Sequence, residues 1–255
     1  MRIKEGKILN ILLSATTILG LLVIWLISAI IVNEGLILPL PWEAFVDMFI
    51  LMGEGSFWLN LMASLGRSLI AFGLSFIFAL GLAVLVKFLK FSSPIIKMFI
   101  AILRAIPTIA IILILLLWTN SRVASIVVTM LVVLPTMFSM MQVSLDNVDG
   151  DIIEMCTLYK IPKKVVFYKY IIPIMLPSIL KSIGSALALN IKLIVASEVL
   201  AGTANSIGNM MSQSKIYFET SRLFALVLIM IIIAVVIEMI FNLISTKVGR
   251  KYGIK

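Results

Sequence analysis

Residues 144–178 read SLDNVDGDIIEMCTLYKIPKKVVFYKYIIPIMLPS, and strongly apolar sequence lies on both sides of them. Charged side chains are dense within this segment and include Asp149, Asp151, Glu154, Lys160, Lys163, Lys164 and Lys169. A polar connection of this length is uncommon, because most connections between elements are short, and the long ones are usually functional. We therefore expect residues 146–177 to form a functional loop between two apolar spans.

The polar loop carries the pattern of two short helices. Apolar residues from Ile152 to Tyr159 fall close to i, i+3, i+4, i+7 spacing, which predicts an amphipathic helix. Two aspartates just before this stretch favour a helix start there. A turn is expected at Lys160–Ile161, and Pro162 is suited to the first position of a second helix. Such a helical hairpin, carried by a membrane protein, forms a docking element for a soluble partner.

The composition is that of an integral membrane protein. The chain has 255 residues, of which 62% are hydrophobic and 13% charged, whereas soluble domains average about 45–50% apolar and about 25% charged residues. Histidine is absent, which argues against His-dependent hydrolases, metalloproteases and haem proteins. The single cysteine, Cys156, excludes an intramolecular disulfide.

Hydropathy predicts an all-α polytopic membrane protein with about six transmembrane helices. The expected spans are residues 8–32, 61–86, 95–118, 123–143, 178–200 and 223–246. Pro107 interrupts the third span and is expected to bend or break it. A short amphipathic interfacial helix is expected from Pro41, and residues 201–221 are expected to form a polar loop.

The distribution of basic residues predicts the orientation in the membrane. About fifteen of the 21 Lys and Arg residues lie in the N-terminal arm, the turn after the second span, the central loop with Lys181, and the C-terminal tail. The positive-inside rule therefore places both termini and residues 146–177 in the cytoplasm. This asymmetry accounts for the net charge of +9, so no nucleic-acid partner is expected.

Several motifs resemble those of a known family. Glu154-Met155-Cys156, Lys160, Tyr170-Ile171-Ile172-Pro173 and Leu176-Pro177 resemble the cytoplasmic E-A-A…G…I-x-L-P loop of ABC importer permeases. Further stretches resemble the nitrate/sulfonate/taurine-type branch, which also includes transporters of thiamine precursors: Ser64-Leu65-Gly66-Arg67, Arg104-Ala105-Ile106-Pro107, Ala196-Ser197-Glu198 and Ser206-Ile207-Gly208. The resemblance covers residues 38–245 and implies one permease domain over residues 1–255.

The resemblance implies a motor on another chain. ATP and Mg would bind a cytoplasmic ABC ATPase, with no cofactor on this chain, which has no G-x-x-x-x-G-K-[ST] phosphate loop. The loop 146–177 would lie in a groove of that ATPase, with Glu154 as polar anchor, Met155, Cys156 and Ile161 as packing surface, and Lys160 and Pro162 at the turn. The other implied partners are a second permease copy, an extracytoplasmic solute-binding protein and the lipid of the bacterial cytoplasmic (inner) membrane.

The loop departs from the family pattern in two places, and in the first of them the two alanines of the family fall at Met155 and Cys156. The loop glycine of the family falls at Lys160, where a left-handed turn conformation would cost lysine about 1 kcal/mol. Either the turn shifts toward Ile161–Pro162, or Lys160 makes a contact that compensates for this cost.

Three ionisable residues within the spans are candidates for the translocation path: Arg104, Lys192 and Glu198. Charges inside a membrane tend to face a bundle interior or a cavity. Arg104 is expected to face freed carbonyls or a cavity, Lys192 a cavity or an interhelical partner, and Glu198 a structural hydrogen bond or a substrate. Lys192 and Arg104 point to a small polar or anionic organic solute, of the sulfonate, nitrate, taurine or thiamine-precursor type.

Two other functions fit less well. An ion-driven secondary transporter should show broken helices at corresponding places in two halves, but Pro107 and Pro135 both lie mid-chain. A membrane-embedded enzyme would need an arrangement such as Ser185 with Lys192, seven residues apart on one helix face. Met137, Met140 and Met141 are expected to serve packing.

Overall fold

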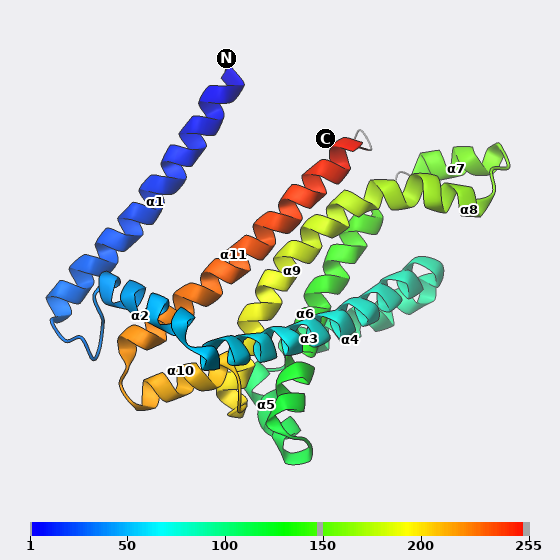
Figure 1. The fold of residues 1–255 in the computed structure, drawn as a ribbon. Helices are drawn as coiled ribbons and strands as arrows, with labels where there is room; N and C mark the ends of the chain where they lie inside the picture. Colours follow the sequence, from blue (N-terminus) through cyan, green and yellow to red (C-terminus); the bar gives the residue numbers. More distant parts are fainter. Residues whose placement is uncertain (1, 147–149, 252–255) are drawn as a thin grey trace. The chain divides into compact units, whose positions relative to one another are not determined.

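The computed structural model describes residues 2–146 and 150–251 (Figure 1). Its elements follow in this order: α1 (Arg2–Val32), α2 (Pro41–Gly53), α3 (Gly55–Phe88), η1 (Lys90–Ser92), α4 (Ser93–Ala105), α5 (Thr108–Trp118), α6 (Ser121–Asp146), α7 (Gly150–Leu158), α8 (Lys163–Val166), η2 (Phe167–Ile171), α9 (Ile172–Ala201), α10 (Ile207–Ile216) and α11 (Thr220–Lys251). The described part of the chain is therefore all-helical, as predicted.

Long apolar helices dominate the chain. Within the described residues, five helices are long and apolar enough to cross a membrane, and the bent pair α4 and α5 makes up to six. The helices begin before the predicted starts of the spans, and those of the second, fourth, fifth and sixth spans also continue past the predicted ends, whereas α1 and α5 end at the predicted residues 32 and 118. The prediction of a polytopic membrane protein with about six spans is confirmed.

The third span is broken where proline was expected to break it. α4 and α5 are bent by 90° relative to each other across Ile106 and Pro107, which both have extended backbones. Pro107 has no N–H and its ring excludes the preceding helical turn, so one helix ends and another begins. The prediction for this position is confirmed.

The central loop is more helical than expected at its C-terminal end. The π-helical turn η2 leads directly into α9, which begins at Ile172, six residues before the predicted start of the fifth span at 178. Pro173 stands in the first turn of α9, where a missing N–H costs nothing. The coupling hairpin, which we define as α7, the turn 159–162 and α8, is thus joined to a membrane helix by continuous helical backbone.

One expectation for the chain is wrong. Residues 201–221, expected to be a polar loop, contain α10. Ser206 precedes this helix, and its Oγ accepts a hydrogen bond from the Asn209 N–H at 2.9 Å, which is the geometry of an N-cap. Because α10 is polar, hydropathy gave no signal for it, and only the capping serine could have indicated it.

The chain divides into two compact units. The first comprises Met1–Leu59 and Met210–Ile229, and the second comprises Asn60–Asn209 and Met230–Lys255. In the first unit, the Trp25 ring stacks on Phe224 with centroids 5.4 Å apart, and its Nε1 donates to the Pro39 carbonyl at 3.1 Å. Arg222 pairs with Glu54 at 2.7 Å in the same unit.

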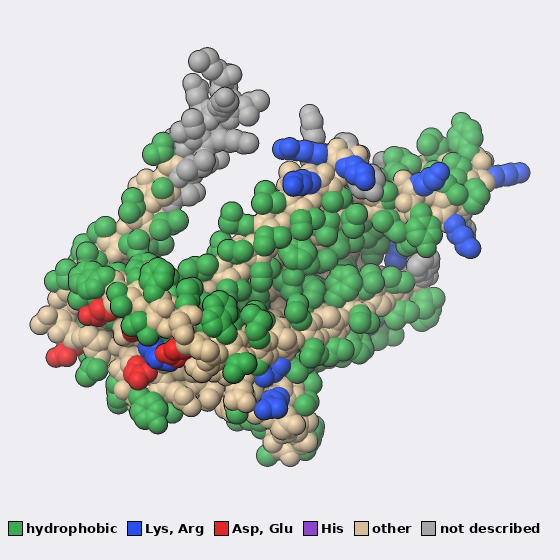
Figure 2. Space-filling model, in the orientation of Figure 1, with side chains coloured by type: hydrophobic (Ala, Val, Ile, Leu, Met, Phe, Trp, Pro, Cys, Tyr) green, Lys and Arg blue, Asp and Glu red, His purple; other side chains and the backbone are tan. Residues whose placement is uncertain are grey.

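The second unit is built on the antiparallel pair α6 and α9. Hydroxyl contacts cross-link the two helices along their length: Ser125–Thr203 just beyond α9, Thr129–Ser197 and Ser144–Ser178. Buried residues of α3, α4, α6 and α9 form its core, among them Ala79, Ile100, Val133, Phe138 and Ala186. Apolar side chains also cover much of the visible outer surface of its long helices (Figure 2), as expected for helices in lipid.

Candidate functional site

The turn of the coupling hairpin has a defined hydrogen-bond pattern. The Lys160 N–H donates to the Thr157 carbonyl at 3.0 Å, and the Ile161 N–H donates to the Cys156 carbonyl at 2.9 Å. These two bonds form a Schellman motif, in which the residue after the helix end takes the left-handed conformation. Lys160 has φ +55° and occupies that position. The turn therefore stays at Lys160, and the alternative of a shift toward Ile161–Pro162 is wrong.

The hairpin presents uncovered apolar side chains. Leu158 and Tyr159 are 77% and 76% exposed, and Met155 is 50% exposed. Of the predicted ATPase-coupling residues, Glu154, Met155, Lys160, Ile161 and Pro162 are exposed and Cys156 is half-buried. A surface of this kind is suited to burial against another protein.

The second arm of the hairpin starts at a proline. The Pro162 carbonyl accepts from the N–H groups of Val165 and Val166 at 2.8 and 3.2 Å, so Pro162 immediately precedes α8. Lysine and arginine side chains gather on the hairpin and at the C-terminal end of α11 (Figure 2). Both regions belong to the side of the membrane that the sequence assigns to the cytoplasm.

Arg104 lines a groove between α4 and α6 whose surface is mostly apolar, with polar groups at a few positions. Its Nη2 donates to the Pro135 carbonyl at 3.1 Å and to Ser139 Oγ at 2.5 Å. The same side chain borders a cavity of about 530 Å³, within the range of about 300–1,000 Å³ typical of small-molecule sites. Arg104 thus faces both a carbonyl and a cavity, but the carbonyl belongs to Pro135 on α6 and not to the helix broken at Pro107.

The groove has two cationic residues and several other polar groups. Its lining consists of Lys97, Ile100, Ala101, Arg104, Phe138, Ser139, Gln142, Val143 and Asp146. Lys97 precedes Arg104 by seven residues, so both lie on one face of α4. Lys97, Ser139, Gln142 and Asp146 were not predicted as groove residues, although the seven-residue spacing from Arg104 was a usable signal for Lys97. The arrangement can hold a small anion by charge and hydrogen bonds.

Glu198 has no exposed surface and belongs to a buried polar cluster. Its carboxylate accepts from Arg67 Nε at 2.7 Å, Ser64 Oγ at 2.8 Å and the Gly208 N–H at 3.3 Å. Arg67 Nη2 also donates to the Asn205 carbonyl at 2.9 Å. We call Ser64, Arg67, Glu198 and Gly208 the Glu198 cluster; it ties α3, α9 and the start of α10 together. Of the two expectations for Glu198, the structure supplies the structural hydrogen bonds, and its contribution to the translocation path stays a prediction.

Gly208 is required by the close approach within this cluster. A Cβ built on it would lie 2.5 Å from Glu198 Cβ and 2.7 Å from the Val199 backbone nitrogen. Real Cβ atoms do not approach other atoms this closely. The glycine therefore lets the start of α10 lie directly on the last turns of α9.

Lys192 lies apart from both sites. It is exposed on α9, and the residues lining the α4–α6 groove do not include it. Two residues earlier, Asn190 is buried and donates to the Ser68 carbonyl at 2.7 Å. The three path candidates thus occupy three places: a groove, an uncovered helix face and a buried cluster.

Ser185 and Lys192 do not form the arrangement that an enzyme would need. The Ser185 hydroxyl donates to Glu238 Oε1 at 2.9 Å and so cross-links α9 to α11. The serine hydroxyl is held in an interhelical contact, which removes the support for that alternative.

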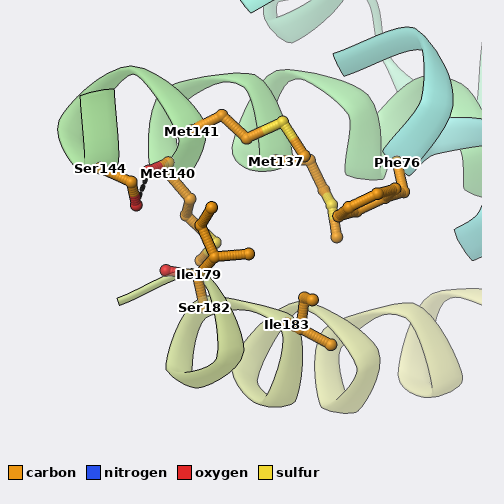
Figure 3. Close-up of a pocket in the computed structure, with 8 residues that line it drawn as sticks. All are labelled: Phe76, Met137, Met140, Met141, Ser144, Ile179, Ser182 and Ile183. Atoms are coloured by element: carbon orange, nitrogen blue, oxygen red, sulfur yellow. Dashed lines mark hydrogen bonds between the residues drawn. The ribbon is translucent and has the colours of Figure 1, made fainter. Parts of the chain in front are cut away.

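A small cavity lies between α6, α9 and Phe76 of α3 (Figure 3). It measures about 10 Å³ and is lined by Phe76, Met137, Met140, Met141, Ser144, Ile179, Ser182 and Ile183. The Met140 side chain points toward Ile179 and the Met137 side chain toward the Phe76 ring, as expected for packing residues. Methionine is flexible and fills irregular gaps, so this junction can adapt to small shifts of the two helices.

Comparison with known proteins identifies similar chains. The family model described as binding-protein-dependent transport system inner membrane component matches residues 71–252. No curated protein matches the chain. Among solved structures, a chain of the MetNI methionine ABC transporter in an inward-facing conformation is similar with a TM-score of 0.63 and 16% identity, over 76% of this chain and 98% of that one. A second crystal form of MetNI gives a TM-score of 0.61 and 18% identity, over 75% and 96% of the two chains. At these identities the two structures support the fold alone.

Proposed function

This chain belongs to the binding-protein-dependent transport system inner membrane components, the permease subunits of ABC importers, and from that premise we propose its solute class and its coupling site. As such a permease it is a multi-pass inner-membrane transport subunit without a catalytic domain. Permeases of this family work with an ATPase that uses ATP and with a binding protein that delivers the solute. We propose that the solute is a small polar or anionic organic molecule, and that the ATPase docks on residues 146–177.

The exposed helical hairpin carries the coupling proposal. Its apolar side chains are uncovered, and continuous helical backbone leads from α8 through η2 into α9. In this proposal Glu154 anchors the hairpin in the ATPase groove, while Met155, Cys156 and Ile161 pack there and Lys160 and Pro162 shape the turn. ATP and Mg bind the ATPase, and its closure moves the hairpin as a rigid body.

The α4–α6 groove supports the anionic solute. Arg104 and Lys97 face a cavity large enough for a small organic molecule, and Ser139 and Gln142 add hydrogen-bonding groups. The resemblance to the nitrate/sulfonate/taurine-type branch is consistent with such a ligand. The Glu198 cluster contributes to the path by fixing α3, α9 and α10 around it.

Lys192 supports a homodimer. It is exposed near the middle of α9, and a charged residue at that depth is costly when it faces lipid. An uncovered face with such a residue therefore needs protein or water beside it. We propose that a second copy of this chain faces it, so that the path runs between the two copies.

Co-purification tests the coupling proposal. The tagged chain is isolated from native membranes in mild detergent, and the proteins that accompany it are identified. We expect a stoichiometric ATPase with the natural chain and its loss with Glu154→Lys, because the reversal places a repulsive charge in the docking surface. Lys247→Glu, an exposed change on α11 outside the hairpin, is the control and should retain the ATPase.

The opposite result would overturn the proposal. A chain that purifies without an ATPase in every detergent would argue against an ATP-driven importer. It would favour the ion-driven secondary transporter. Equal ATPase recovery with Glu154→Lys and Lys247→Glu would place the docking surface elsewhere.

A further inference from the structure

We propose that Lys160 forms an ion pair with a carboxylate in the groove of the ATPase, and that this pair helps to determine which ATPase the permease accepts. The inference rests on the proposed docking of the coupling hairpin and adds the chemistry of one contact to it.

The backbone gives no reason for lysine at this position. Lys160 has φ +55° and closes the Schellman motif at the end of α7. Glycine adopts this conformation without a Cβ penalty and asparagine tolerates it better than most residues. Strained residues persist where function requires them, and they cluster at binding and switch regions. The lysine side chain therefore has a role that its backbone position does not explain.

The charge of Lys160 has no ion-pair partner among the residues 2–146 and 150–251 that the structure describes. Ion pairs of the described residues join Arg67 to Glu198 and Arg222 to Glu54 and Glu219, and none of these involves Lys160. Its side chain is exposed. The sequence left open a contact of Lys160 that would compensate for the cost of its left-handed conformation. The structure shows no such ion pair among the described residues.

The neighbours of Lys160 explain why a partner carboxylate is needed. Leu158 and Tyr159 directly precede it and are 77% and 76% exposed, and Ile161 follows at 38%. Docking that buries these apolar side chains also removes water from the lysine ammonium. A charge that loses its hydration is costly unless an opposite charge replaces the water.

The position of the turn favours a protein partner over lipid. Lys160 lies where α7 meets α8, at the end of the hairpin remote from α9 (Figure 1). Lys164 and Lys169 lie further along the arm that leads back to the membrane helix. An anionic lipid headgroup would meet those lysines before it met Lys160.

Three substitutions at Lys160 separate charge from backbone conformation. Lys160→Asn and Lys160→Gly keep the left-handed turn and remove the charge, whereas Lys160→Arg keeps the charge. Affinity for the purified ATPase is measured with the full permease in lipid nanodiscs, at about 50 and about 300 mM salt. We expect Asn and Gly to weaken binding about tenfold or more and to reduce its salt dependence, with Arg within about threefold of the natural chain. Lys247→Gln is the matched charge-removal control outside the hairpin and should bind normally.

A zero-length cross-link tests the contact directly. A water-soluble carbodiimide activates a carboxyl group, the Lys160 amine attacks it, and an amide forms as the urea leaves. We expect one cross-linked peptide that joins Lys160 to an Asp or Glu of the ATPase. Lys160→Arg should bind and yet lose this cross-link, because its guanidinium does not react.

Each outcome decides the inference. Asn and Gly variants that bind as tightly as the natural chain, or a natural complex without the Lys160 cross-link, would overturn it. If Lys160→Asn weakens ATPase binding in nanodiscs rich in anionic lipid and leaves ATPase binding in detergent unchanged, the partner of Lys160 is lipid and the inference is wrong. If the natural chain binds no ATPase, the proposed function fails; if Glu154→Lys abolishes binding and Lys160→Asn does not weaken it, only this inference fails.

Discussion

Glu198 is a fully buried carboxylate whose charge faces the Arg67 guanidinium at 2.7 Å. Glu198→Gln keeps the shape of the side chain but leaves Arg67 without its counter-charge. Removal of one partner of a buried pair costs about 3–5 kcal/mol. We therefore expect Glu198→Gln to lower the free energy of unfolding by about 3 kcal/mol, measured by denaturant titration in detergent micelles.

A more exposed ion pair provides the control for this prediction. Glu54 and Arg222 also lie 2.7 Å apart, but each side chain is 30% exposed. Pairs open to water contribute about 0–1 kcal/mol, so Glu54→Gln should have a much smaller effect. Equal losses for the two variants would contradict the structural role assigned to the Glu198 cluster.

At the residue scale, the sequence predicted a structural role for Glu198 but not which residues bind its carboxylate. A carboxylate near the outer end of a span needs a hydrogen-bond donor, so a structural role was one of two expectations. The donors Ser64 and Arg67 lie 134 and 131 residues away along the chain. No local spacing connects residues so far apart, and only the packing of α3 on α9 brings them together.

The α4–α6 groove makes a prediction for the transport reaction. Arg104→Met removes a cationic donor from the groove, and a charge-assisted hydrogen bond contributes enough to change affinity about tenfold. Proteoliposomes with the ATPase and the binding protein are first tested with labelled taurine, an alkanesulfonate and nitrate. For the solute that is carried, Arg104→Met should raise the half-saturating concentration about tenfold.

Two further variants make this result interpretable. Arg104→Lys keeps the charge and should restore part of the affinity, although lysine lacks the planar fork of arginine. Lys181→Met, near the cytoplasmic end of α9 and outside the groove, should transport normally. A carried solute without a negative group, or unchanged kinetics with Arg104→Met, would exclude the groove as an anion site.

At the element scale, hydropathy and proline predicted the long helices and the break between α4 and α5. They did not predict α10, whose stability comes from a serine cap and burial of Ile207 and Met210 rather than from an apolar run. The turn at Lys160 was left undecided, because propensity disfavours lysine there. In the structure, the hydrogen bonds from the Lys160 and Ile161 N–H groups hold Lys160 in the left-handed conformation despite that preference.

The orientation of the whole molecule can be tested with one accessible thiol. Cys156 is the single cysteine, so Cys156→Ser with Leu158→Cys leaves one thiol on a position that is 77% exposed. A membrane-impermeant maleimide should label it in inside-out vesicles and not in right-side-out vesicles, since positive-inside charge places the hairpin in the cytoplasm. Added ATPase should slow the labelling of inside-out vesicles by covering the site.

If the maleimide labels the cysteine at position 158 in right-side-out vesicles, the hairpin lies outside the cytoplasm and the predicted orientation is wrong. Labelling at an unchanged rate in the presence of bound ATPase would leave the topology intact and move the docking surface away from Leu158. A cysteine in place of Trp42, 54% exposed on α2, should give the opposite sidedness and provides the control.

The close approach of α9 to α11 has a mechanical consequence. A Cβ on Gly184 would lie 2.6 Å from Phe241 Cβ, so the α9 backbone packs there directly against the Phe241 side chain of α11. The contact divides the 30-residue α9 into arms of about 18 and about 26 Å at 1.5 Å per residue. Hydroxyl contacts to α6 hold α9 near both ends, so α9 is expected to move together with α6 and α11 rather than to pivot between them. In the proposed coupling, a displacement of the hairpin would reach the Glu198 cluster through the π-helical turn η2 and past Pro177 inside α9, as a shift of the group of helices that α9 joins.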